Sequence, residues 1–274
     1  MKIALAAVVA AAATLGAQAL PAFDALSVKR NTTNADSGFS AAPAPGQIRL
    51  VNVPLHFILL QALGVREHEM VGSPEWAHYE AFDIIGRYPT DAVPVGQQRR
   101  MIEQALVERF GLKTHREQRQ MPVYRLVMAR TDKRLGPRLE PSSVDCQQWF
   151  AEKKPQLGAG GPSPVAPGGA RPACLLMAQR RLITAGTQPI SRLARALESM
   201  VDRLVIDETG LAGNYNIDLE FAPTIEAGGN AAPNPDGAPS IFTALQEQLG
   251  LRLEADRRPV DVVVIDGIDR PTPD

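Results

Sequence analysis

The chain has 274 residues, of which 45% are hydrophobic and 22% are charged. These fractions are ordinary for a globular protein that buries a core. A formal net charge of −1 and an aromatic content of 5% exclude the strongly basic or aromatic-rich surfaces that nucleic-acid binding uses. We therefore expect no nucleic-acid partner.

The first 19 residues have the pattern of a secretory signal peptide. Lys2 is the single charge before Asp24, residues 3–13 are uninterrupted apolar sequence, and residues 17–19 read Ala-Gln-Ala, a small-x-small cleavage sequence. We expect cleavage after about Ala19 and a mature protein that is periplasmic or secreted and has no transmembrane segment. The alternative is an uncleaved N-terminal anchor, although the apolar run is short for spanning a bilayer.

The chain has two cysteines, Cys146 and Cys174. In an oxidising compartment such a pair usually forms a disulfide. A redox-active pair would more typically have the C-x-x-C spacing, which these two residues lack. We predict a structural disulfide, which restrains the unfolded chain by about 3–4 kcal/mol in the chain-entropy description.

An internal repeat is the strongest signal along the chain. Residues 105–113 (ALVERFGLK) match residues 244–252 (ALQEQLGLR) at five of nine positions. A second pair follows in the same order, residues 121–129 (MPVYRLVMA) and 258–266 (RPVDVVVID). Two matches in the same order predict two diverged copies of one structural module.

Each copy predicts a helix followed by a hairpin. Apolar side chains recur at helical spacing, in the first copy Met101, Ile102, Ala105, Leu106 and Phe110, and in the second Ile241, Phe242, Leu245 and Leu249. Gly111 and Gly250 follow at the position of a left-handed C-terminal cap. β-rich segments then predict two strands per copy, 112–116 with 123–129 and 251–255 with 260–265.

The repeat extends upstream with weaker matches. Segments 82–85 and 215–219 predict a strand before each of these helices, and an earlier strand leads into a helix opened by Pro54 or Pro189. We therefore predict an α+β fold of two tandem similar β-α-β-β-α-β-β modules, with mixed or antiparallel sheets and helices packed on one face.

The predicted boundaries follow from the repeat and from composition. They are a signal peptide at 1–19, a first module at 20–150, a linker at 151–172, a second module at 173–270 and a tail at 271–274. The linker assignment rests on its composition, because ten of its 22 residues are Gly or Pro.

No sequence motif marks a catalytic, metal or cofactor site. The four histidines lack metal-ligand spacing, and no nucleophile elbow or phosphate-binding loop is present. We therefore expect no metal and no cofactor. His56 lies in an almost wholly apolar helical segment, which is typical of a hydrogen-bonded structural histidine.

Weak site candidates remain. An enzyme would need a polar cluster in a cleft between the modules, and the candidates for it are His115, Glu117, Arg119 and Asp207. Residues 207–215 also read as a structural turn, because the stretch contains two glycines. Trp76 and Tyr79 lie in a predicted loop, where such aromatic residues either anchor a ligand or cap the core.

Seven ordered stretches carry a resemblance to a known family: residues 52–55 (NVPL), 72–76 (GSPEW), 82–84 (FDI), 105–113, 121–124 (MPVY), 207–215 (DETGLAGNY) and 239–251 (PSIFTALQEQLGL). They resemble the Solibacter-type secreted family of unknown function, which is abundant in acidobacteria. Its domain is sometimes attached to membrane metallopeptidases of the antibiotic-sensor type, and the peptidase part and its zinc motif are missing here. The resemblance implies sensing or binding outside the membrane and carries over no catalytic residue.

The sequence thus favours an exported, non-catalytic binding or interaction protein of the cell envelope, with an envelope protein or peptide as partner. The alternative is an envelope-acting hydrolase with its site between the modules.

Overall fold

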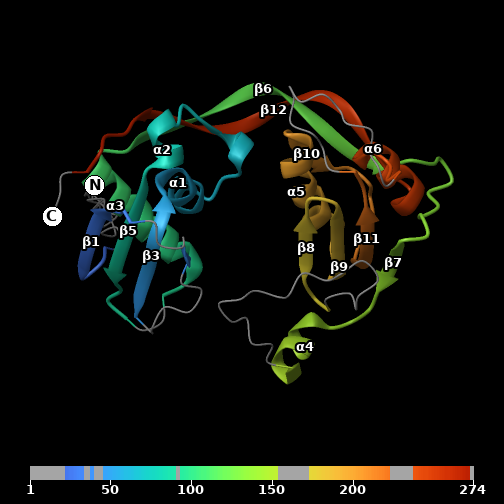
Figure 1. Ribbon diagram of the computed structural model, residues 1–274, viewed down its shortest axis with the longest axis horizontal. Coiled ribbons are helices and arrows are strands. Elements are labelled where there is room, and N and C mark those ends of the chain that lie inside the picture. Colours follow the sequence, from blue (N-terminus) through green and yellow to red (C-terminus); the bar gives the residue numbers. More distant parts are fainter. Residues whose placement is uncertain are drawn as a thin grey trace, which may run out of the picture. The chain divides into compact units, whose positions relative to one another are not determined.

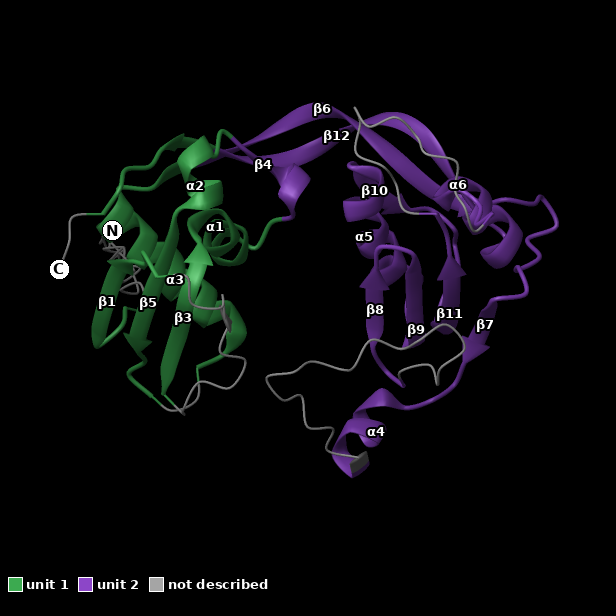
Figure 2. Ribbon diagram, in the orientation of Figure 1, with its two compact units in different colours: residues 1–65, 72–114, 265–274 green, residues 66–71, 115–264 purple. Residues whose placement is uncertain are grey.

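The computed structural model of the chain describes residues 22–33, 38–39, 46–90, 93–153, 173–222 and 237–271. The predicted signal peptide, nearly all of the predicted linker and most of the tail lie outside these ranges. The chain divides into two compact units, shown in different colours in Figure 2. Unit 1 comprises residues 1–65, 72–114 and 265–274, and unit 2 comprises residues 66–71 and 115–264.

Unit 1 is built on an antiparallel sheet with the strand order β1-β5-β3-β2. Its strands are β1 Ala25–Arg30, β2 Gly38–Phe39, β3 Gln47–Pro54 and β5 Ala81–Arg87, and its helices are α1 Leu55–Leu63, α2 Glu75–Tyr79 and α3 Val95–Phe110. All five predicted core positions of α3 are buried, which confirms the predicted helix face. Gly111 caps α3 with a left-handed φ of 61°, as predicted.

Unit 2 contains a second antiparallel sheet, with the order β7-β11-β9-β8. Its strands are β7 Leu139–Ser142, β8 Leu176–Gln179, β9 Leu182–Gln188 and β11 Asn214–Glu220, and its helices are α4 Cys146–Lys153, α5 Ile190–Val201 and α6 Ile241–Ala244, which continues as a π turn over Leu245–Leu249. Leu193, Ile217 and Leu245 belong to one buried cluster that joins α5, β11 and the π turn. Phe242, predicted for this core, is instead 39% exposed and packs edge-on against Tyr124.

A third, mixed sheet has the order β10-β6-β12-β4. Its members are β6 Lys113–Met128, β12 Leu251–Gly267, β10 Leu204–Asp207 and the two-residue β4 Met70–Val71, which follows a 3-10 turn over Glu67–Glu69. Figure 1 shows β6 and β12 as two long strands. Mixed and antiparallel sheets with helices confirm the predicted α+β class.

The predicted hairpins were wrong, because each is one continuous strand. β6 and β12 are neighbours in the sheet. Their backbone groups therefore form hydrogen bonds with the other long strand and need no partner strand from a hairpin within their own segment. The pairing is antiparallel: the Ala129 amide donates to the Gly250 carbonyl at one end, and the Asp269 amide donates to the Phe110 carbonyl at the other.

Each long strand also pairs with a short strand from the other half of the chain. β10 runs parallel to residues 123–126 of β6, and β4 runs parallel to residues 263–264 of β12. Residues 66–71 therefore belong to unit 2, although they lie among residues of unit 1 in the sequence. The compact units are consequently discontinuous in sequence, and the predicted linker lies between residues that both belong to unit 2.

The sequence repeat has a structural counterpart at one unusual backbone position in each half. Asn52 and Thr187 both have a φ of 54°, and each lies two residues before the proline that caps a helix. Asp83 Oδ1 accepts from the Asn52 amide at 2.8 Å, and Asn216 Oδ1 accepts from the Thr187 amide at 3.1 Å. The strand register shifts at both places. This common device aligns the two halves residue by residue, with α1 corresponding to α5.

Candidate functional site

The aligned helices α1 and α5 bury five equivalent positions, and α1 also buries His56, where α5 has the exposed Ser191. Leu55, Ile58 and Ala62 of α1 are buried, as are their counterparts Ile190, Leu193 and Leu197 of α5. The core therefore requires apolar residues at these three positions of both helices.

The outer faces of these helices differ sharply. Phe57 is 55% exposed where α5 has the exposed Arg192, and the partly exposed Leu60 of α1 corresponds to the exposed Arg195. A surface helix normally carries polar residues on its solvent side, and α5 follows that rule. The outer face of α1 is instead apolar at positions where the fold accepts arginine.

Aromatic rings continue from α1 onto α2. The His56 ring is 5.8 Å from that of Phe57 and stacks on His78 at 3.9 Å, and His78 is 6.5 Å from Tyr79, all measured between ring centroids. Tyr79 is 77% exposed. We call the outward-facing residues Phe57, Leu60, His78 and Tyr79 the aromatic surface. The buried His56 contacts the rings of both Phe57 and His78.

His56 supports this surface from below. It is 5% exposed, and its Nδ1 lies 3.3 Å from Ser73 Oγ, within hydrogen-bonding distance. This confirms the prediction of a hydrogen-bonded structural histidine. Because the ring of His56 is held from one side by Ser73 and stacks on His78 at the other, it fixes α2 against α1.

Trp76 and Tyr79 lie on the short helix α2, so the predicted loop was wrong at this point. Pro74 is the N-terminal cap of that helix, which begins at Glu75. Trp76 is half-buried, and the Arg270 guanidinium lies 4.7 Å from its ring centroid. Trp76 thus fastens α2 to the C-terminal segment, whereas Tyr79 faces outward.

Glu80 completes this attachment. Arg270 Nη2 donates to Glu80 Oε1 at 2.6 Å, and Arg30 Nε lies 3.3 Å from Glu80 Oε2. The hydrogen bond from Arg270 is the main reason that the pKa of Glu80 is lowered. Both arginines are therefore paired with this carboxylate.

The structure brings three of the four weak catalytic candidates together. His115, Glu117 and Arg119 lie at alternate positions of β6 and are exposed to between 38% and 49% of their side chains. His115 Nε2 is 3.7 Å from Glu117 Oε2, and Arg119 Nε donates to the same carboxylate. That bond from Arg119 is the main cause of the lowered pKa of Glu117, which keeps the group ionised and makes it a poor proton donor.

Asp207 lies elsewhere on the same sheet. Its strand partner is Leu126, seven residues beyond Arg119, or about 23 Å along the strand. Asp207 Oδ1 accepts from both the amide and the hydroxyl of Thr209 and so closes its own turn. Gly210 and Gly213 follow with φ values of 69° and 87°, which confirms the predicted structural turn.

Three carboxylates on or beside the third sheet are paired with arginine. Arg125 Nη1 is 3.0 Å from Glu208, its Nη2 is 2.5 Å from Glu254, and its Nε is 3.2 Å from Asp256. Arg258 contacts Glu208 and Asp256 as well. Within the described ranges, no group of three or more His, Cys, Asp or Glu residues is arranged to hold a metal ion.

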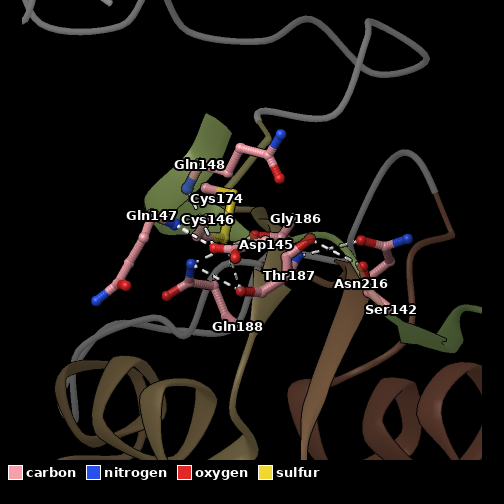
Figure 3. The surroundings of a disulfide bond; sticks show 10 residues. All are labelled: Ser142, Asp145, Cys146, Gln147, Gln148, Cys174, Gly186, Thr187, Gln188 and Asn216. Atoms are coloured by element: carbon pink, nitrogen blue, oxygen red, sulfur yellow. Dashed lines mark hydrogen bonds between the residues drawn. A yellow bond between two sulfur atoms is a disulfide. The ribbon is translucent and has the colours of Figure 1, made fainter. Parts of the chain in front are cut away.

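The predicted disulfide between Cys146 and Cys174 is confirmed. Figure 3 shows it beside the unusual backbone of Thr187, whose carbonyl oxygen is 3.8 Å from Cys146 Sγ. Thr187 Oγ1 and Ser142 Oγ share a hydrogen bond of 2.8 Å. The disulfide thus joins α4 to the segment that leads into β8, and it lies beside the bulged strand β9 of the second half.

The fold and surface define a class, that of α+β proteins built from two similar halves that share one mixed sheet through long strands. The chain belongs to the family described as "Protein of unknown function (DUF3738)", whose sequence pattern matches residues 57–268. No curated protein and no solved structure matches the chain. No helix in the described part of the chain is long and apolar enough to cross a membrane.

Proposed function

We propose that the chain is an exported, non-catalytic binding protein of the cell envelope and that it binds through the aromatic surface. The observation that carries this proposal is the difference between α1 and α5. The same two scaffold positions carry Phe57 and Leu60 in one half and Arg192 and Arg195 in the other.

Exposed aromatic residues at such a position indicate a role in binding rather than a structural role. Arg192 shows that the fold does not need an apolar residue there, and the edge-on contact of Phe57 with His56 leaves the side chain 55% exposed. Burying a Phe side chain completely yields about 1.5–3 kcal/mol, and much of that remains unrealised in the chain alone. Contiguous exposed apolar groups commonly mark interaction sites.

Export is supported by two independent features. The first 19 residues have the signal-peptide pattern, with cleavage after about Ala19, and the Cys146–Cys174 disulfide is typical of oxidising compartments. The resemblance to the Solibacter-type secreted family agrees, since the domain of that family is sometimes attached to membrane metallopeptidases of the antibiotic-sensor type. We place the mature protein in the periplasm or outside the cell.

A site-specific photo-crosslinker tests the proposal. It is placed at Tyr79 in one variant and, as the matched control, at Arg192 in another, and each protein is incubated with cell envelopes. We expect a distinct adduct from position 79 and none from position 192. Adducts of equal yield at both positions, or none at either, would contradict the assignment of the site.

A further inference from the structure

We infer that the chain associates with a second copy of itself through one edge of the long strand β6. We call residues 115–122 of this strand the free edge; all of them belong to unit 2. The inference goes beyond the proposed function and does not depend on the aromatic surface. It follows from the unpaired length of the strand, the direction of its backbone groups and the order of its charges.

One side of β6 is paired over only part of its length. The strand has 16 residues and lies beside β12 on one side, whereas β10, its neighbour on the other side, has four residues and pairs with residues 123–126. Within the described ranges, no strand pairs with the free edge on the side of β10. The His115 and Arg119 side chains of this edge are 49% and 44% exposed. An unpaired, accessible edge of this kind is a template for another strand.

The backbone groups that point to the free side belong to the even-numbered residues. The Leu126 carbonyl accepts from the Glu208 amide on the side of β10, and the Ala129 amide donates to the Gly250 carbonyl on the side of β12. Because the backbone groups of successive residues in a strand point to opposite sides, the even-numbered residues of 116–120 direct their N–H and C=O groups away from β12.

A second copy of β6 satisfies these groups about a two-fold axis. Such an interface uses the same surface on both copies. With the axis at Gln118, the backbone of Gln118 faces that of Gln118 in the second copy, and the backbone of Arg116 faces that of Gln120. The Gln120 carbonyl already accepts from Arg257 Nη2 at 3.1 Å, and its second lone pair is left for the second copy.

The charges of the free edge are complementary in this register. Glu117 lies opposite Arg119 of the second copy, and Arg119 lies opposite Glu117, so the bond that Arg119 donates to Glu117 within one copy is repeated across the axis. These are non-hydrogen-bonded pairs, in which facing side chains are closest. An axis one residue away places Glu117 opposite Glu117 or Arg119 opposite Arg119, and like charges in direct opposition are destabilising. The order of charges therefore selects the axis at Gln118.

The length of the unpaired stretch gives the same axis. β10 begins to pair at Val123, and β6 begins at Lys113. A two-fold axis at Gln118 relates these two positions, so the β10 of one copy lies at the end of the second copy's β6 and not across its middle. A second copy supplies the complementary charges and the matching length by symmetry, whereas an unrelated peptide would have to match both by chance.

Charge reversal at the free edge tests the inference. Sedimentation equilibrium of the full mature protein should show a monomer–dimer equilibrium. Glu117→Arg places an arginine opposite Arg119, and Arg119→Glu places a glutamate opposite Glu117, so each variant should weaken dimerisation about tenfold or more. An equimolar mixture of the two variants should dimerise like the wild type, because every facing pair again has opposite charges. Arg192→Glu, an equal change of charge on the exposed face of α5, is the matched control and should have no effect.

A cysteine at the axis gives a second readout. The two cysteines of the chain are joined in the disulfide, so Gln118→Cys introduces a single free thiol. Facing residues of a hydrogen-bonded antiparallel pair have Cα atoms about 5.5 Å apart, which is within the range of a disulfide. Oxidation with copper phenanthroline should therefore link Gln118→Cys into a covalent dimer, and the control Arg192→Cys should stay monomeric.

Each outcome supports or overturns the inference. A protein that is monomeric up to its solubility limit and that Gln118→Cys does not crosslink overturns it. A dimer that persists in both charge variants, or one that their mixture does not restore, shows that the copies associate elsewhere. If a charge variant unfolds, the crosslink at Gln118 decides alone, since its absence rejects the free edge. The aromatic surface is tested separately by the photo-crosslinker at Tyr79, so the two proposals fail independently.

Discussion

The two halves of the chain build the same sheet and helix but present different surfaces. Strand order, the register shift before the first helix and the buried positions of α1 and α5 agree in both. The outer faces do not agree, since one has aromatic and apolar residues where the other has arginines. The features that the two halves share are those that the scaffold requires. The residues that differ between them are the candidates for function.

The comparison also separates two ways of stabilising one backbone feature. Asn52 tolerates a positive φ well, whereas Thr187 is β-branched and adopts it at a cost of about 1–3 kcal/mol. The second half places the disulfide and the Ser142 hydrogen bond around that threonine, and the first half relies on Asp83. The crosslink therefore lies beside the more strained of the two bulges.

The largest expected effect concerns the disulfide, which has no counterpart in the first half. The double variant Cys146→Ser, Cys174→Ser should lower the free energy of unfolding by about 3–4 kcal/mol, because the cross-link no longer restrains the unfolded chain. Urea denaturation followed by circular dichroism measures it, and reduction of the wild type serves as the control. A loss below about 1 kcal/mol would contradict this account.

The next effect concerns an ion-pair group of unit 2, formed by Arg66, Glu69 and Glu198. Arg66 Nη1 and Nη2 each lie 2.5 Å from a carboxylate oxygen, of Glu198 and Glu69 respectively, and Glu198 corresponds to the apolar Leu63 of the first half. Arg66→Ala leaves both largely buried carboxylates without this partner, so stability should fall by about 2–3 kcal/mol, less than for a fully buried pair. Equilibrium denaturation checks the size, and Arg192→Ala should show almost no change.

Removing the hydrogen-bond acceptors at the two bulges should cause two smaller losses of stability, of different size. Asp83→Ala leaves the Asn52 amide and the Asn31 side chain without their acceptor, whereas Asn216→Ala affects the Thr187 amide alone. We expect losses of about 2 kcal/mol and about 1 kcal/mol respectively. Thermal unfolding of the two variants, compared side by side, measures the order, and the reverse order would refute the equivalence of the bulges.

The smallest effect is a pH dependence of opposite sign at two neighbouring carboxylates. Burial raises the pKa of Glu198, only partly offset by the charge of Arg66. Burial would also raise the pKa of Glu69, but hydrogen bonds from Arg66 outweigh it and lower the value. Above the usual value of 4.5 the unfolded state therefore loses the Glu198 proton first, so this group contributes a stability that declines as pH rises.

Unfolding measured from pH 4 to pH 7 tests the two signs. Glu198→Gln should gain stability relative to the wild type as pH rises above about 4.5, whereas Glu69→Gln should lose relative stability over the same range. The Glu69 contribution is present above its unfolded pKa and disappears as pH falls. Parallel curves for both variants would show that the two carboxylates are not differently perturbed.

Local sequence patterns predicted the helices and strands well, but they did not predict the pairing between distant segments. The faces of α3 and the caps at Gly111 and Gly250 follow from helical spacing and from the conformational freedom of glycine. The hairpins failed because Pro122 and Pro259 resemble turn boundaries, whereas the partner strand lies more than a hundred residues away. Sequence spacing carries no information on which segment pairs with which.

Only part of the candidate site was predicted from the sequence. Both Trp76 and Tyr79 were singled out as loop aromatics, and only the contact of Trp76 with Arg270 separates their roles. Phe57 and Leu60 were missed, because an apolar helix reads as a buried one. Aligning residues 55–63 with 190–198 through their opening prolines would have placed Phe57 against Arg192 and revealed the difference.

Hydrogen–deuterium exchange of the full mature protein, with and without a soluble envelope extract, tests the central claim most directly. The account predicts slower exchange on ligand addition within Leu55–Leu63 and Glu75–Tyr79, no change within Ile190–Val201, and loss of the effect in Phe57→Arg. Slower exchange in Ile190–Val201 with none in Leu55–Leu63 would contradict it.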